Sequence, residues 1–177
     1  QGHPVPADYA MDPKVANDPR YAATLEAALL SIPSLSIALS PDDLFGADGI
    51  YANPLARAEE RIDPETGATV RPWERAASVE WLPPDGSPGF QIDAGIRIAG
   101  GWSRKPDSTA KHSFSLRFRS MYGEGRLRYP LFDGDGPASF DALRLRGGQA
   151  DTFHYFADKA QYVHDQWGRD TQRDMGW

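Results

Sequence analysis

Two adjacent segments in which apolar and polar residues alternate constrain the fold of this chain most. Residues 95–104 and 111–119 flank a turn rich in Gly, Ser and Pro. The apolar positions of one parity are Phe90, Ile92, Ala94, Ile96, Ile98, Phe114, Leu116 and Phe118, and Arg97, Arg117 and Arg119 take the other parity. Strand side chains alternate between two faces with a period of two residues. The pattern therefore predicts a strand pair with one apolar face and one guanidinium-rich face.

The charge of the chain is unevenly distributed along its length. Residues 97–146 hold ten Lys or Arg and five Asp or Glu, a net +5, so the overall −6 leaves −11 for the remainder. A cationic face in an acidic chain indicates that an anion is bound there, whereas the overall charge argues against general nucleic-acid binding. A second interpretation remains open, in which the arginines pair with distant acids on a solvated face.

Length and composition are typical of one globular domain. The chain has 177 residues and no Cys, so it has no disulfide or thiolate chemistry. No apolar run is long enough to span a membrane. The start, residues 1–4, is polar and shows no signal peptide, and we expect a processed or trimmed piece of a longer protein.

Hydrophobic periodicity predicts an α+β fold: an antiparallel sheet of about five strands with an N-terminal and a C-terminal helix. The predicted helices and strands are a helix over 19–32, strands over 35–39, 73–82, 90–98, 114–118 and 143–146, and one helical turn over 41–46. Residues 47–70 show no periodicity, which is uncommon inside a domain and often functional. Phe153, Phe156, Ala160, Val163 and Trp167 form the apolar stripe of a last helix that we expect to face the sheet.

Two basic residues near the turn are candidates for contact with phosphate. Lys111 begins a strand just after the turn, where its ammonium group can hold a nucleotide phosphate as a point charge. Arg104 in the turn can add a bidentate grip. An ordinary strand-end lysine and a solvent-exposed arginine are the alternatives. Trp102 is either a core residue or an exposed stacking surface for a sugar or base.

Acidic and histidine clusters favour turns rather than metal sites. Asp133, Asp135 and Asp141 lack the later glutamate of an EF-hand, so an Asp/Gly turn is predicted. His154 and Asp158 lie one helical turn apart, but two ligands are poor support for a metal. No metal-ligating residue is predicted, and zinc-protease, P-loop, Rossmann and nucleophile-elbow patterns are absent.

Several separate motifs follow one another over residues 35–176. They are Asp43-Leu44-Phe45-Gly46, Gly49-Ile50-Tyr51, Trp73-Glu74-Arg75, Gly95-Ile96-Arg97-Ile98, Gly100-Gly101, Ser103-Arg104, Lys111, Ser113-Phe114, Tyr129-Pro130-Leu131-Phe132, Phe140-Asp141 and Arg169-Asp170. In this order they resemble the CotH family, named for spore coat protein H.

The resemblance implies a secreted or cell-surface protein. Some CotH members resemble atypical protein kinases that phosphorylate serine in coat proteins with ATP and a divalent metal, and others are adhesins. By this resemblance, residues 1–34 are an N-terminal extension and helix, and residues 35–177 resemble the N-terminal lobe of a CotH-type kinase. ATP with Mg (or Mn) is expected for the complete protein.

The resemblance also implies which residues contact the nucleotide. Ser103, Arg104 and Lys111, together with Arg117 on the arginine-bearing face, would meet the ATP phosphates. Lys111 stands in a Lys-His-Ser context where the family often has Lys-Lys-Ser.

The family's catalytic and metal-binding aspartates lie in a second lobe, downstream of the helix that closes this chain. No catalytic residue is assigned here, since Asp151 is a local stand-in at best, and we expect the isolated chain to be inactive. The expected partners are a missing C-terminal lobe or another subunit and a surface or coat protein substrate with Ser or Thr. The alternative function is a non-catalytic extracellular adhesion or scaffold module that recognises a glycan or a protein.

Overall fold

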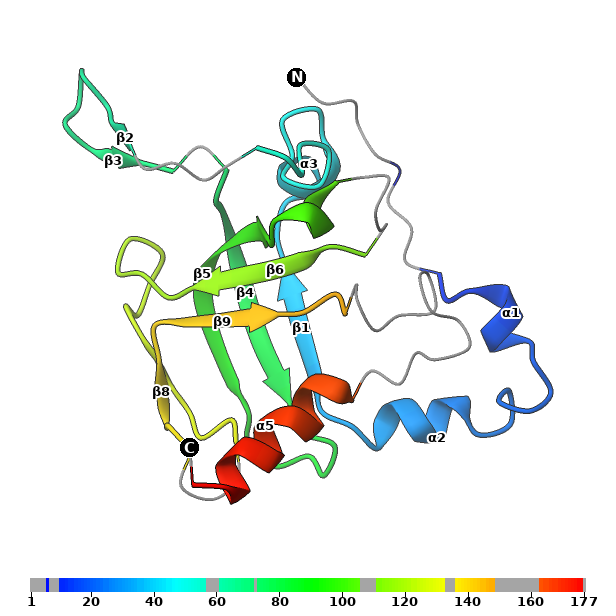
Figure 1. The fold of residues 1–177 in the computed structure, drawn as a ribbon. Coiled ribbons are helices and arrows are strands. Elements are labelled where there is room, and N and C mark those ends of the chain that lie inside the picture. The colour runs from blue at the N-terminus through cyan, green and yellow to red at the C-terminus, as the bar shows by residue number, and fades with distance from the viewer. Residues whose placement is uncertain are drawn as a thin grey trace.

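The fold is α+β and is built on a five-stranded antiparallel sheet, as predicted (Figure 1). The computed structural model describes residues 6, 10–56, 61–71, 73–105, 111–132, 136–148 and 163–176. The strand order is β1-β4-β5-β6-β9. These strands span Ser34–Ala38 (β1), Arg75–Leu82 (β4), Phe90–Ala99 (β5), Ser113–Arg117 (β6) and Ala142–Leu145 (β9). All five coincide closely with the segments that alternation predicts.

Two smaller sheets and several short helices accompany the five-stranded sheet. Strands β2 and β3 pair as one short antiparallel ribbon, and β7 and β8 pair as another. Their strands span Arg61–Ile62 (β2), Thr69–Val70 (β3), Leu127–Arg128 (β7) and Ser139–Phe140 (β8). The helices are α1 (Pro13–Ala16), α2 (Leu25–Leu30), α3 (Pro41–Phe45), the 3₁₀ turn η1 (Trp102–Arg104) and α5 (His164–Asp174). Helix α3 confirms the single turn predicted over 41–46.

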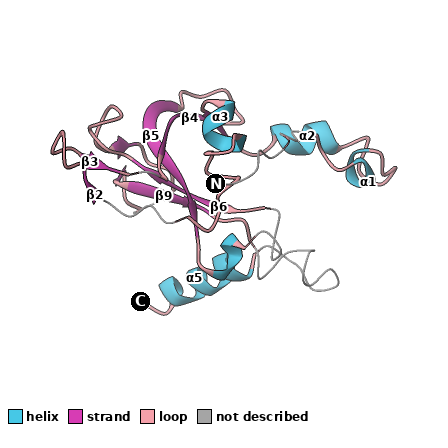
Figure 2. Ribbon diagram, turned by 90° about the horizontal axis from the view of Figure 1, so that it is seen from above, coloured by secondary structure: helices cyan, strands magenta, loops and turns pink. Residues whose placement is uncertain are grey.

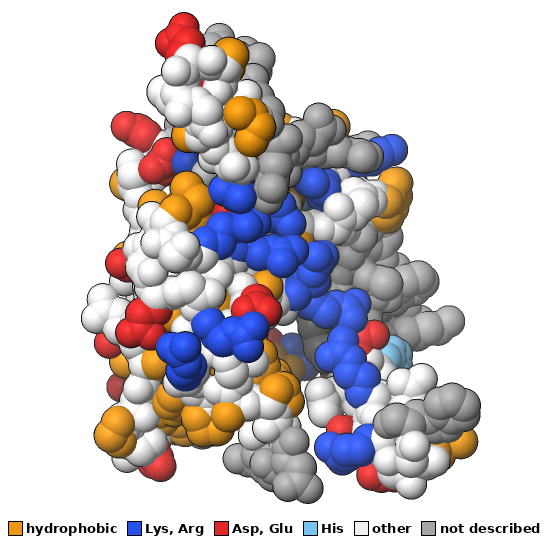
Figure 3. All heavy atoms as spheres, turned by 90° about the vertical axis from the view of Figure 1, so that its left-hand side faces the viewer, with side chains coloured by type: hydrophobic (Ala, Val, Ile, Leu, Met, Phe, Trp, Pro, Cys, Tyr) orange, Lys and Arg blue, Asp and Glu red, His pale blue; other side chains and the backbone are white. Residues whose placement is uncertain are grey.

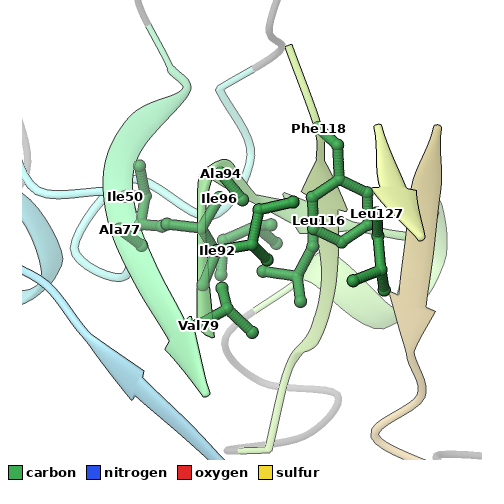
Figure 4. Close-up of a cluster of buried hydrophobic side chains, with 10 residues drawn as sticks. Ile50, Ala77, Val79, Ile92, Ala94, Ile96, Leu116, Phe118 and Leu127 are labelled. Atoms are coloured by element: carbon green, nitrogen blue, oxygen red, sulfur yellow. The ribbon is translucent and has the colours of Figure 1, made fainter. Parts of the chain in front are cut away.

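Strand register places the apolar residues on one face of the sheet. Ile96 pairs with Leu116, which pairs with Leu143, and the remaining apolar positions of the same parity continue these rows. The buried cluster is drawn in Figure 4 and comprises Ile50, Ala77, Val79, Ile92, Ala94, Ile96, Ile98, Leu116, Phe118 and Leu127. Burial of these side chains is the main force that fixes the register, since a slip of one residue would expose them all.

Two segments from outside the sheet complete the core. Ile50 lies in the loop after α3 and is 2 % exposed, and Leu127 enters from β7 and is equally buried. Leu44 of α3 packs against the same cluster. In Figure 2, α3 lies on one side of the sheet and α5 on the other. The apolar face is therefore covered by loop and ribbon residues as well as by a helical turn.

The segment without periodicity contains ordered structure. The Ile50 and Tyr51 amides donate to the carbonyls of Asp43 and Leu44, each at 2.9 Å. The Asn53 side-chain amide donates to two more carbonyls of the loop, those of Ala47 at 2.8 Å and Gly49 at 2.9 Å. Residues 46–56 are thus a compact loop, and the β2–β3 hairpin follows further along the chain. Sequence periodicity missed both because neither buries a regular face.

The predicted helix over 19–32 is wrong in extent. Within this range the structure has the short helix α2, which turns precede and which buries no residue, and α1 lies earlier in the chain. Leu29 and Ile32 of the predicted stripe are 48 % and 57 % exposed. Short helices gain most of their stability from tertiary packing. Since the described residues offer this stripe no partner surface, only brief helical turns form.

The last helix differs from its prediction as well. Helix α5 begins at His164, and Val163 and Trp167 of the predicted stripe are 54 % and 72 % exposed. These two side chains therefore do not face the sheet. Phe153, Phe156 and Ala160 lie outside the described residues, as do Asp133, Asp135, Asp151, His154 and Asp158. Over the described ranges, no helix has the length and hydrophobicity needed to cross a bilayer.

Candidate anion-binding site

The face of the sheet opposite the core carries a row of arginines. Arg97 of β5 lies directly opposite Ser115 of β6, and Ser115 lies directly opposite Arg144 of β9. In the next row Arg117 lies opposite Gly95. Figure 3 shows that Lys and Arg side chains gather in a band across one side of the molecule. We call Arg97, Arg117, Arg119 and Arg144 the arginine face.

Three of these guanidinium groups form no ion pair with a residue that the structure describes, although Glu74 attracts one of them, Arg117. Arg97, Arg117 and Arg144 make no hydrogen bond or ion pair there, and the Arg117 Nε atom is buried without a partner. Burial, followed by repulsion from Arg97, Arg119 and Arg144, lowers the pKa of Arg117. Within the described ranges, Glu74 neutralises only part of the positive charge of the face, and a bound anion would relieve the remaining repulsion.

One buried acid lies at the edge of the arginine face. Glu74 has a side chain that is 0 % exposed, and its Oε1 accepts hydrogen bonds from Arg119 Nε at 3.1 Å and Tyr122 Oη at 3.2 Å. Its Oε2 is buried and has no partner among the described residues. The positive charge of Arg117 and Arg119 offsets part of the cost of burying this carboxylate. Glu74 therefore supplies one negative charge against four arginines.

Gly95 makes room for this carboxylate. A Cβ atom on Gly95 would lie 2.6 Å from Glu74 Oε1 and 2.6 Å from Tyr122 Cε2. Burial, then the charge of Glu74 and its hydrogen bond, raise the pKa of Tyr122 to about 12. The phenol therefore remains a hydrogen-bond donor to Glu74 across the physiological range.

A hollow of about 490 Å³ adjoins the arginine face where β5 ends. Its described lining residues are Leu55, Arg97, Ile98, Ala99, Gly100, Gly101, Arg104 and Arg144. Gly100 has a φ of +108°, a conformation that residues with a side chain rarely adopt. At Gly101 nothing lies within 4 Å of where a Cβ atom would stand, so its backbone is open to close approach. The volume of the hollow falls within the range of small-molecule sites.

Arg104, which the sequence singled out, lines this hollow and also holds the loop after α3. Its Nε donates to the Pro54 carbonyl at 2.6 Å, and its Nη2 donates to the Ala56 carbonyl. These contacts fix one wall of the hollow. Two of the N–H groups of Arg104 are thereby committed to the protein.

Ser103 is anchored through its backbone. The buried His112 donates from Nδ1 to the Ser103 carbonyl at 3.3 Å, and its ring packs on Tyr51 with centroids 5.0 Å apart. A carbonyl can only accept, so the neutral ring carries its proton on Nδ1. Burial, together with the charge of Arg104, lowers the pKa of His112 despite this hydrogen bond. This contact ties η1 to the start of β6.

Lys111 and Arg117 differ in their relation to the hollow. Lys111 is exposed just before β6 and is not one of the described residues that line the hollow. Arg117 lies within the arginine face, next to the row that borders it. The structure thus brings Arg104 to the hollow and Arg117 beside it, and leaves Lys111 at the rim of the sheet.

A divalent cation is bound through several oxygen ligands. No group of three or more His, Asp or Glu side chains comes together within the described residues. The acid beside the arginine face is Glu74, whose Oε1 is occupied by Arg119 and Tyr122. Mg²⁺ prefers carboxylate and water oxygens, so we assign no step of any reaction to a metal held by these residues.

The sequence places Arg97 on the guanidinium-rich face but does not single out Arg97, Arg144, Ser115 or Glu74 as individual site residues. The alternation of the strands does place three of these residues on the polar face. Arg97 and Ser115 alternate with the apolar residues of their strands, as Arg117 does, and Arg144 alternates with Leu143 and Leu145. Only the pairing of β6 with both β5 and β9 brings them into one row. The position of Glu74 over Gly95 has no local signal at all.

Comparison with known proteins gives no relative, since no family model matches the chain and neither a curated protein nor a solved structure is significantly similar.

Proposed function

We propose that this chain is the nucleotide-binding N-terminal portion of a secreted CotH-like atypical protein kinase. The complete protein would transfer phosphate from ATP to Ser or Thr of surface or coat proteins. The observation that carries the proposal is a face with three guanidinium groups that lack partners within the described residues, beside a hollow with a glycine-pair rim. Such a face is complementary to the phosphates of a nucleotide.

The motifs that resemble the CotH family support the same location. Glu74, Arg97, Gly100 and Arg104 come from four of these motifs, and they all lie around the arginine face or its hollow. Residues distant in sequence but adjacent in space are typical of a binding site positioned by a rigid sheet. This coincidence favours a function for the face over a merely solvated surface.

Each part of the site has a chemical task in this proposal. Arg97, Arg117 and Arg144 bind phosphate oxygens, and the Gly101 backbone permits close approach. The hollow, with Leu55 and Ile98 in its wall, accommodates the nucleoside. Orientation of the attacking hydroxyl requires an acid, which the resemblance places in a second lobe. The chain alone is therefore expected to bind ATP without transferring phosphate.

Calorimetric titration of the chain with ATP tests the proposal. We expect saturable binding that Arg117→Ala weakens about tenfold, because a hydrogen-bonded charge pair is lost. Lys111→Ala tests the lysine that the resemblance implies, and it should weaken binding as well. Arg128→Ala is the matched control, since Arg128 is exposed in β7 and pairs with Glu124 at 3.9 Å. An absence of ATP binding by the folded chain would overturn the proposal.

A second function remains a candidate because of one exposed aromatic side chain. Trp102 in η1 is 58 % exposed and directly follows Gly101 at the hollow. An exposed indole is a suitable stacking surface for a sugar ring. A non-catalytic module that recognises a glycan or a protein would bind its ligand without any response to ATP. Glycan-array binding that is lost in Trp102→Ala, together with no ATP binding, would favour this function.

A further inference from the structure

We infer that the arginine face holds a phosphate group in a slot over Ser115, between the guanidinium groups of Arg97 and Arg144. This inference rests on the proposed nucleotide-binding function and names the atoms that would receive the phosphate chain. The slot uses three residues that the sequence did not select, and it lies beside the hollow that Arg97 and Arg144 line.

The register of three strands creates the slot. Arg97, Ser115 and Arg144 stand opposite one another on β5, β6 and β9, with their side chains on the same face. Adjacent strands lie about 4.8 Å apart, so the two arginine backbones are separated by roughly 10 Å. Two long side chains at this separation can close from both sides on one tetrahedral oxyanion above the small residue between them.

The floor of the slot is polar and has no partner within the described part of the chain. Ser115 is 2 % exposed, although it lies on the face opposite the core. Its hydroxyl makes no hydrogen bond with a described residue. A hydroxyl at this depth can donate to a phosphate oxygen while the guanidinium groups bind the other oxygens in their bidentate geometry.

The charge of the face indicates how much negative charge the ligand carries. The face carries four arginines, and Glu74, which contacts Arg119 and attracts Arg117, offsets only part of their charge. Arg117, in the row beside Ser115, repels Arg97 and Arg144 and has a buried Nε without a partner. A di- or triphosphate chain matches the remaining positive charge better than a single carboxylate does. The site therefore selects its ligand by phosphate charge.

Ser115 also sets the size of the slot. A larger side chain at this position would occupy the space between the two arginines that the phosphate needs. Ser115→Val fills that space with a residue that suits a strand, whereas Ser115→Ala keeps the space and removes only the hydroxyl. The pair of variants separates steric exclusion from loss of one hydrogen bond.

The test is calorimetric titration of the chain and its variants with inorganic phosphate, pyrophosphate and ATP at constant salt. We expect pyrophosphate to bind more tightly than phosphate, and ATP to compete with it. Arg97→Ala, Arg144→Ala and Ser115→Val should each weaken pyrophosphate and ATP about tenfold, and Ser115→Ala should weaken them less. Arg97→Lys should bind more weakly than the wild type, because it keeps the charge but loses the planar fork. Arg128→Ala should change nothing, and thermal unfolding verifies that each variant is folded.

The outcomes separate the slot from the proposed function. If ATP binds and the Arg97, Arg144 and Ser115 variants leave its affinity unchanged, the slot is wrong and nucleotide binding stands. If pyrophosphate binds with the expected dependence but ATP does not bind, the slot stands and the proposed function is overturned. If no probe binds to the folded chain, both are overturned.

Discussion

Individual glycine and histidine residues decide whether the arginine face can be assembled. Gly95 leaves the space that Glu74 and Tyr122 occupy above the sheet, and Glu74 in turn holds Arg119. His112, just before β6, donates a hydrogen bond to the Ser103 carbonyl and so links η1 to β6. Gly95 and His112 are not proposed to contact the ligand. They position the strands and the turn that carry the proposed ligand-binding residues.

Gly95→Ala should lower the free energy of unfolding by about 1–3 kcal/mol, because the new methyl group overlaps Glu74 and Tyr122. Urea unfolding of both proteins measures this change. Gly125→Ala is the control, since a Cβ atom there would come no closer than 3.5 Å to its nearest neighbour, Ser120 N. Equal destabilisation by the two substitutions would contradict the packing described for Glu74.

The buried His112 makes stability depend on pH. Its pKa is lowered in the folded chain, so above about pH 6.5 both states are neutral and its contribution to stability is complete. As the pH falls below 6.5, the unfolded chain takes up a proton first and stability decreases. The loss of stability between pH 7.5 and 5.5 should be smaller in His112→Gln, as measured by urea midpoints at both values. An identical pH dependence in the two proteins would refute this role.

The five strands are the stable elements of the molecule, and the short helices are accessories. The strands carry their apolar residues on one face and so form a continuous core, which neither α1 nor α2 reaches with a buried side chain. Leu116, at the centre of this core, is 0 % exposed, whereas Leu82 at the end of β4 is 45 % exposed.

Leu116→Ala should therefore cost about 2–5 kcal/mol of unfolding free energy, since a fully buried side chain leaves a cavity. Leu82→Ala, the same change at an exposed strand end, should cost no more than about 0.5 kcal/mol. Chemical denaturation followed by tryptophan fluorescence gives both values. The order of the two effects would be reversed if the sheet packed its other face into the core.

At the scale of the whole molecule, the basic side chains are unevenly distributed. The chain has a net charge of −6, yet its cationic residues gather in a band on one side of the molecule (Figure 3). The net negative charge of the chain repels anions in general. Binding at the arginine face should thus be local and sensitive to ionic strength, because salt screens partly exposed charges.

Raising the salt concentration from about 0.05 M to about 0.5 M should weaken pyrophosphate binding, since the Debye length falls below about 5 Å. Titration at several salt concentrations measures the slope. The double variant Arg97→Ala/Arg144→Ala should show a shallower slope than the wild type, and Arg126→Ala/Arg128→Ala should show an unchanged one. A slope common to all three proteins would indicate that no particular arginines carry the binding.

The sequence predicted the strands of the sheet more accurately than the helices around it. Alternation identified β4, β5, β6 and β9 because burial of one face imposes a period of two on the sequence. The helix expected over 19–32 and the stripe through Trp167 were read from periodicity as well, but exposed apolar residues show the same spacing as buried ones. Periodicity reveals which face could be buried, and it does not reveal whether a partner surface exists.

The sequence by itself determined the α+β class, the two faces of the strands and the cationic character of one face, since these follow from local alternation and composition. Only the tertiary structure decided that Arg97, Ser115 and Arg144 form one row. It also decided that Glu74 lies over Gly95 and that Arg104 closes the loop after α3. These relations join residues 18 to 50 positions apart, and such contacts depend on which strands pair and how loops pack on them, which the pattern within a single strand does not specify.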